Sequence, residues 1–229
     1  ARSQRYERTG GPAMQVAHWY RPAIFQVSIW LDWRQLISLI YPRQPTAEPD
    51  PMWALLRTGI DRFSDKLNAA LAQLDILDQC KDLKIDHICV RLKHNADVDR
   101  LKEQLLEAGR LISTADVNGR EISIVQLHSP LMVGAWEVSG VEVPYPKPGH
   151  AYEDGWEHVE FVLNGAANTM DGIRQAFIER FPNLTIDELQ QACGYSEDAP
   201  LADKDQMPNP TLGIRVNGVG LKFHAHPIQ

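Results

Sequence analysis

The chain has 229 residues, of which 44% are hydrophobic and 23% charged, so it can bury a substantial core and is not compositionally disordered. Its formal net charge of −7 argues against a protein that binds nucleic acid through a basic face. Its three cysteines, Cys80, Cys89 and Cys193, are widely spaced and odd in number, which favours reduced thiols in a cytoplasmic protein over a disulfide framework.

Residues 1–51 differ in composition from the rest of the chain. They contain no lysine, and the first lysine of the chain is Lys66. They end in the proline-rich run YPRQPTAEPDP. We therefore expect an N-terminal extension outside the main fold; an arm packed on the domain is the alternative. The apolar stretch Ala23–Tyr41 does not match a membrane-spanning helix, because polar and charged residues interrupt it at Gln26, Asp32, Arg34 and Gln35.

Residues 52–229 are expected to form a single domain that begins with a packing helix over 52–80. Apolar residues recur there every three or four positions, which places one apolar stripe on a helix: Leu56, Ile60, Phe63, Leu67, Leu71 and Leu74. We assign this helix no chemistry.

A first module over 81–150 has the order strand, helix and three strands. Leu83–Leu92 alternates like a strand, and a helix then begins at the cap residue Asn95 and ends at Gly109. The strands LISTADV and EISIVQL are joined by Asn118-Gly119, a strong hairpin signal, and AWEVSGVEVPYP closes the module.

A second module over 151–229 repeats this order. WEHVEFVL is its first strand, Thr169–Phe181 its helix, and TLGIRV and VGLKFHAH form a hairpin around Asn217-Gly218. The segment 184–190 fits a strand or a helix. The first strands carry His87 and His158, each directly after an acidic residue, which indicates a faint internal duplication.

Histidines and charged residues share one face of several predicted strands. Side chains two apart lie on the same face of a strand. By this rule the first strand of each module and the last strand of the second have one apolar and one polar face, and the third strand of the first module has two polar residues on one face. If the two modules form one curved sheet, the polar faces line a shared cavity with the ligand types of zinc, iron, manganese or nickel. The residues on these faces are His87, Cys89 and Arg91; Gln126 and His128; His158 and Glu160; Lys222, His224 and His226. Glu157 is expected on the opposite face or at its edge.

Several segments together resemble a known family. The segments DHICVR, VNGREISIVQLHSP, VEVPYP, GWEHVEFVL, MPNPTLGIRVNG and LKFH resemble the YecM-type proteins, a branch of the vicinal oxygen chelate superfamily of glyoxalase, bleomycin-resistance and dioxygenase proteins. The resemblance covers about residues 52 to 226. It implies an α+β fold in which two βαβββ modules form a curved, barrel-like mixed sheet around a central cavity, preceded by an N-terminal helix.

The resemblance also implies a divalent metal ion in the central cavity. In this superfamily the residues that bind the ion usually come from the first and last strands of each module. By that rule the ligands are His87, Glu142, His158 and His224, with Glu160 and His226 as substitutes for Glu142 or His224. The ligand types suit zinc, nickel, manganese and iron and do not select among them.

These residues lead to two hypotheses about function. The first is a metal-dependent isomerase, lyase or dioxygenase acting on a small oxygen-chelating anion, with Glu160 or His128 as general base and Arg91 and Lys222 attracting the substrate. The second is a metal-free binding protein with aromatic cavity walls formed by Trp136, Tyr145, Tyr152 and Trp156. A third reading takes His158-Val159-Glu160 with His224 as the H-x-D/E…H triad of non-haem iron oxygenases, but the arginine that a 2-oxoglutarate member needs does not follow His224. A cupin is excluded because no glutamate follows His224-Ala225-His226. We expect a monomer, since two modules complete a site within one chain.

Overall fold

The computed structural model describes residues 51–117, 119–166, 168–192, 194–198 and 209–228. All described residues lie in one compact unit. Residues 1–50 of the expected extension 1–51, with its apolar stretch, and Cys193 lie outside the described residues, whereas Pro51 is already helical. Among the helices of the described part, none has the length and apolar character needed to cross a membrane.

The predicted first helix is three helices in the structure: α2 (Pro51–Thr58), α3 (Ile60–Gln73) and α4 (Leu77–Cys80). Gly59 separates the first two, and Asp75 adopts a left-handed conformation with φ 57° that ends the next. The predicted apolar stripe does pack inward, since Phe63, Leu67 and Leu71 are buried.

The first module follows the predicted order. It contains β1 (Ile85–Arg91), α5 (Asn95–Ala108), β2 (Gly109–Asp116), β3 (Glu121–Val133) and β4 (Trp136–Pro144). The N-cap of α5 is His94, whose backbone is extended, so the expected cap Asn95 is already helical. The helix ends at Gly109 as expected, where the chain runs against β3 so closely that a Cβ would lie 2.4 Å from the backbone oxygen of Gln126.

The second module has the same order with two additions. It contains β5 (Gly155–Val162), α6 (Met170–Arg180), α7 (Ile186–Ala192), β6 (Ser196–Asp198), β7 (Thr211–Val216) and β8 (Val219–His224). The hydroxyl of Thr169 caps α6 by accepting from the backbone of Gly172. The ambiguous segment 184–190 is largely helical, and the short strand β6 was not predicted. Asn217 and Gly218 both have positive φ, as a tight hairpin requires.

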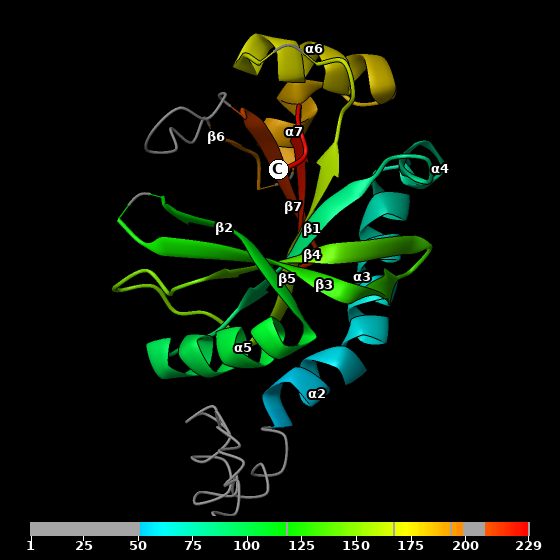
Figure 1. Cartoon of the computed structure of the whole chain (residues 1–229). Helices are drawn as coiled ribbons and strands as arrows, with labels where there is room; N and C mark the ends of the chain where they lie inside the picture. Colours follow the sequence, from blue (N-terminus) through cyan, green and yellow to red (C-terminus); the bar gives the residue numbers. More distant parts are fainter. Residues whose placement is uncertain (1–50, 118, 167, 193, 199–208, 229) are drawn as a thin grey trace, which may run out of the picture. The chain divides into compact units, whose positions relative to one another are not determined.

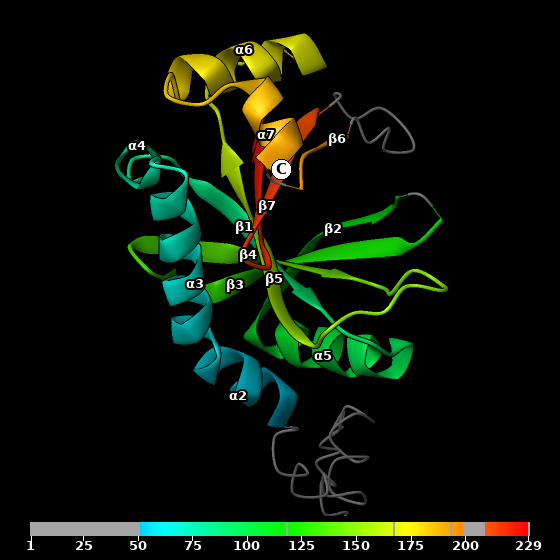
Figure 2. The same cartoon turned by 180° about the vertical axis from the view of Figure 1, so that it is seen from behind.

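The strands form one sheet in the order β2-β3-β4-β1-β5-β8-β7-β6, whose two halves meet where β1 and β5 pair antiparallel. Within each half the first strand pairs parallel with the last, β1 with β4 and β5 with β8. The sheet is curved and does not close, because β2 and β6 remain edges (Figures 1 and 2). The α+β fold of two βαβββ modules is therefore confirmed.

The helices pack on one face of this sheet. Helix α3 contacts β3 and β8, α5 contacts the first half, and α6 contacts the second (Figure 2). The core on this face crosses the module boundary: the ring of Phe161 packs against Trp136 of the first module and Phe223 of the second. The buried polar residues of the strands belong to a different set and include His87, Glu142, His158, Glu160 and His224.

Candidate metal centre

The two modules place equivalent residues around their junction. In the first, His87 lies beside Gly140 and Cys89 beside Glu142, through the parallel pairing of β1 with β4. In the second, His158 lies beside Gly220 and Glu160 beside Lys222, through the pairing of β5 with β8. Glu142 and Lys222 are therefore equivalent by register, as are Cys89 and Glu160. The last strand of the second module offers a lysine where the first offers a carboxylate.

Each histidine lies over a glycine of the neighbouring strand. A Cβ on Gly140 would lie 2.8 Å from the Cβ of His87, and one on Gly220 would lie 2.7 Å from the Cβ of His158. Contacts this short do not occur between real Cβ atoms. The two glycines thus leave the space that the histidine side chains occupy, and they do so at equivalent positions of the two modules.

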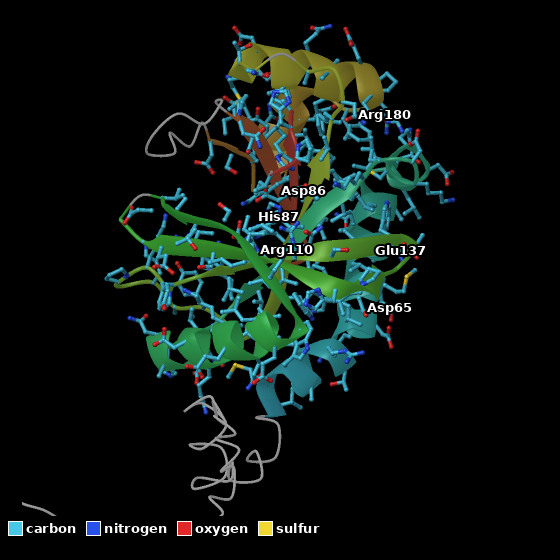
Figure 3. The ribbon with its side chains drawn as sticks, in the orientation of Figure 1. Asp65, Asp86, His87, Arg110, Glu137 and Arg180 are labelled. Carbon is cyan, nitrogen blue, oxygen red and sulfur yellow. The ribbon has the colours of Figure 1, made fainter. Side chains whose placement is uncertain are left out.

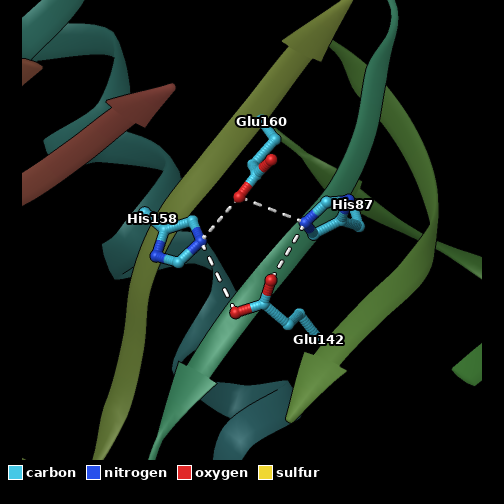
Figure 4. A group of neighbouring side chains, drawn as sticks. All are labelled: His87, Glu142, His158 and Glu160. Atoms are coloured by element: carbon cyan, nitrogen blue, oxygen red, sulfur yellow. Dashed lines mark ion pairs between the residues drawn. The ribbon is translucent and has the colours of Figure 1, made fainter. Parts of the chain in front are cut away.

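Two histidines and two carboxylates from three strands converge (Figure 4). Nε2 of His87 lies 3.3 Å from Oε2 of Glu142 and 3.4 Å from Oε1 of Glu160. Nε2 of His158 lies 3.3 Å from Oε1 of Glu160 and 3.8 Å from Oε1 of Glu142. One ligand atom from each of the four residues lies within 4.8 Å of the others, and all four residues are buried. We call these four residues the metal group.

The far side of each imidazole contacts a carboxylate. Nδ1 of His87 lies 3.0 Å from Asp86, and Nδ1 of His158 lies 2.9 Å from Glu157. A carboxylate accepts the proton of Nδ1, which leaves the lone pair on Nε2, the arrangement typical of metal-binding histidines. Both Nε2 atoms are buried without a hydrogen bond to any described residue. In Figure 3, Asp86 and His87 lie next to each other near the middle of the sheet.

Glu157 does not lie on the face opposite His158. The β1–β5 register changes between Cys89, which faces His158, and Val90, which faces Trp156, so Glu157 is the extra residue of a β-bulge. The bulge brings its carboxylate to His158, Arg91 and Arg215.

The same bulge turns Trp156 toward the helices. Its Nε1 donates to the backbone of Leu56, and its ring lies against Trp53 and Phe63. The structure therefore does not place Trp156 in the metal group. Trp136 is buried in the core beside Phe161, so neither of these tryptophans forms the aromatic wall expected for a metal-free binder.

The charges around the metal group shift its protonation equilibria. Burial opposes ionisation of Glu160, but the ammonium of Lys222, 2.6 Å away, and the histidines hold the pKa of its carboxyl well below the usual value. Burial and His87 act in the same opposing way on Glu142, whose pKa is also low. Burial alone would lower the pKa of His87, but Glu160 and the other carboxylates raise it well above 6.5.

The carboxylates around the metal group are matched by cations. Asp86, Glu142, Glu157 and Glu160 lie among four: Arg91 and Lys222 inside, Lys84 beside Asp86 and Arg215 beside Glu157 from the surface. Two buried Nε2 atoms without a hydrogen bond to a described residue lie next to the ionised carboxylates of Glu142 and Glu160. Imidazole and carboxylate donors together fit a divalent cation bound at this place.

The remaining predicted residues lie elsewhere. His224 is buried with its ring centroid 6.1 Å from that of His87, but it is not part of the metal group. His128 is exposed on β3, and His226 contacts Asn168. Arg91 forms an ion pair with Glu157 at 2.6 Å and lies over the ring of Tyr152.

Sequence reasoning did not assign a role to Asp86, Glu157 or Asn209. The signal for the first two was present, since an acidic residue precedes each first-strand histidine. Asn209 had no such signal, because it lies 15 residues before His224 in the sequence and meets it only in the folded chain.

Comparison with known proteins gives concordant matches. The family model described as YecM protein matches residues 54–229. Protein YecM of Escherichia coli (strain K12) is 33% identical over 176 residues, which cover 76% of this chain and 89% of that protein. A protein of Haemophilus influenzae (strain Rd) is 28% identical over 151 residues, covering 64% and 76%. The solved structure of Protein EC4020 superimposes with a TM-score of 0.63 at 26% identity, covering 81% of this chain and 95% of that one.

Proposed function

The chain belongs to the YecM protein family, and on that premise we propose that it is a metal-dependent enzyme whose divalent cation is held by the metal group. The observation that supports the proposal most strongly is the convergence of two carboxylates with two buried Nε2 atoms that have no described hydrogen-bond partner. Asp86 and Glu157 hold both imidazoles in the tautomer that a ligand needs.

The proposed ligands are His87, Glu142, His158 and Glu160. Glu160 had two possible roles, ligand or general base, and its contacts with both Nε2 atoms support the ligand role. Imidazole and carboxylate donors together suit zinc, nickel, manganese and iron, so the ligand set does not select among them.

The proposed substrate is a small anion that chelates the ion through two oxygen atoms. A bound dication supplies Lewis-acid polarisation of such oxygens. Arg91 and Lys222 lie beside the metal group and contribute positive charge for an anion. Isomerase, lyase and dioxygenase reactions all use this arrangement. Because one chain supplies all four ligands, we propose that a monomer is sufficient; a cytoplasmic location remains a prediction from the cysteines.

The test is the metal content of the protein purified without a histidine tag. We expect about one divalent ion per chain by elemental analysis of the wild type, and none in the His87→Ala/His158→Ala double variant. The control is His128→Ala, which removes an exposed histidine and should leave the metal content unchanged.

Two results would contradict the proposal. One is a folded wild-type protein that stays metal-free after loading with zinc, nickel, manganese and iron(II). The other is a double variant that folds, shown by circular dichroism, and keeps its full metal content. The protein would then be a metal-free binder, or its metal would lie elsewhere.

A further inference from the structure

His224 differs from the two histidines of the metal group in the group that holds its ring. The Nδ1 atoms of His87 and His158 face carboxylates, which only accept hydrogen bonds. Nδ1 of His224 instead lies 2.8 Å from the amide nitrogen of Asn209, which only donates. The proton of His224 must therefore be on the other nitrogen.

Asn209 has a fixed amide orientation because His226 binds both of its ends. Its Oδ1 accepts from the backbone N–H of His226 at 3.2 Å, and its Nδ2 donates to the backbone oxygen of His226 at 2.9 Å. Turning the amide round would set its NH2 group against the N–H of His226 at one end and its oxygen against the carbonyl oxygen of His226 at the other. Nδ2 therefore faces His224.

The consequence is a neutral imidazole with its proton on Nε2. A proton on Nδ1 would point at the N–H of Asn209, so the hydrogen-bond geometry excludes both the other tautomer and the charged ring. A metal ligand needs a lone pair on the coordinating nitrogen, and Nε2 of His224 does not have one available. That Nε2 is buried and has no hydrogen-bond partner among the described residues, so it is a donor without an acceptor.

The position of His224 fits a donor to something bound at the metal group. On β8 it lies two residues beyond Lys222, and its ring packs edge-on against His87 at 6.1 Å between centroids. It contributes no atom to the set that lies within 4.8 Å. The ring is thus adjacent to the metal group but outside it.

We propose that His224 is the hydrogen-bond donor of this site and not a metal ligand, and that its Nε2–H binds an oxygen atom of the small anion held at the metal group. Asn209 is the positioning residue that sets the tautomer. The identity of the bound anion rests on the proposed function, whereas the tautomer of His224 does not.

The first experiment reads the tautomer directly. Protein labelled with ¹⁵N-histidine is measured by long-range ¹H–¹⁵N correlation at mildly alkaline pH, and the His224→Gln variant identifies the signals of His224. We expect the Nε2-protonated pattern in the wild type. In Asn209→Asp a carboxylate replaces the donor, so the pattern should change to Nδ1-protonated. An Nδ1-protonated ring in the wild type would overturn the inference.

The second experiment separates a donor from a ligand. Zinc-loaded protein is titrated with oxalate, a dianion that chelates through two oxygens. His224→Ala should keep its zinc and bind oxalate about tenfold more weakly, the net effect of one hydrogen bond. His224→Gln should recover most of that affinity, because its amide nitrogen can donate from a similar place. His158→Ala, the matched control, should lose zinc.

Two outcomes contradict the donor role: loss of zinc in a folded His224→Ala variant, or unchanged oxalate affinity in that variant. Failure of the proposed function gives different results, namely a wild type that binds no cation or a zinc-loaded wild type that does not bind oxalate. The tautomer measurement still decides the assignment of His224 in that case.

Discussion

At the scale of single residues, the tautomers of three buried histidines are set by what lies behind each ring. Asp86 and Glu157 accept from Nδ1 of His87 and His158 and so direct Nε2 of each ring to the metal group, whereas Asn209 donates to Nδ1 of His224. Residues of the same type, all 1% exposed, thus acquire different chemistry from their neighbours. Their position on the strand faces alone does not distinguish them.

Removing the carboxylates behind the two ligand histidines should weaken metal binding without abolishing it. We expect Asp86→Asn and Glu157→Gln each to lower metal affinity by about ten- to a hundredfold, because the ring loses its fixed tautomer and some basicity. Competition with a chelating dye measures the affinity. Glu137→Gln on the exposed end of β4 is the control and should bind as the wild type does. Equal affinities in all three variants would mean that these carboxylates do not support a metal site.

Cys80 should be inert in the folded protein. Burial raises the pKa of its thiol to about 12, so its thiolate is scarce until the pH approaches that value. In a Cys193→Ser background we expect alkylation by iodoacetamide at pH 8 to be on the order of a thousandfold slower than for a free thiol. Mass spectrometry of the native and the denatured protein measures the rates. Rapid native labelling of Cys80 would show that α4 opens readily.

At the scale of elements, the site depends on how closely the first and last strands of each module approach. β4 and β8 carry glycine opposite the histidines of β1 and β5, at positions related by the module repeat. The β-bulge in β5 also shapes the site. It places Glu157 and Trp156 on sides of the strand that regular alternation would not give them.

Gly220→Ala should damage the metal site through His158. The new Cβ would lie 2.7 Å from the Cβ of His158, so the strand or the imidazole must move. We expect a loss of metal affinity of at least tenfold and a destabilisation of about 1–3 kcal/mol, typical of overpacking. Thermal unfolding and metal titration measure both. Gly59→Ala between α2 and α3 is the matched control, because its Cβ meets only ordinary contacts at 3.4 Å and its backbone is helical. A Gly220→Ala protein with unchanged metal affinity would argue against this close approach.

At the scale of the whole domain, the two modules share one sheet and one core. The β1–β5 pairing lies in the middle of the strand order, and Phe161 of β5 packs on residues of both modules. The metal group also spans this junction, with His87 and Glu142 from one module and His158 and Glu160 from the other. Neither module alone contains a complete set of ligands.

We therefore expect the two modules to unfold together. Phe161→Ala should lower the stability by about 3–5 kcal/mol, the usual cost of removing a buried phenylalanine, and should leave a single transition. Tryptophan fluorescence, to which Trp136 of the first module and Trp156 of the second contribute, and far-UV circular dichroism should give coincident denaturation curves. Two separated transitions would show that the modules are independent units.

Local patterns in the sequence determined the element order, the apolar faces and the polar faces of the strands. Alternation put His87, His158, Glu160 and His224 away from the helix-packed core, and the hairpin at Asn217-Gly218 follows from residues that tolerate positive φ. These features depend on side chains within a few positions of each other. The resemblance to the YecM proteins added the pairing of the modules, which periodicity alone does not determine.

Only the tertiary structure decided which of these polar residues meet. The β1–β5 register and its bulge, the break of the first helix and the contact of Asn209 with His224 join residues that are far apart in the chain or depend on small changes of backbone direction. Side-chain alternation gives the face of a strand but not its register against a distant strand. For this reason Glu160, rather than the equally polar His224, joins the metal group, and His224 acquires the opposite hydrogen-bonding role.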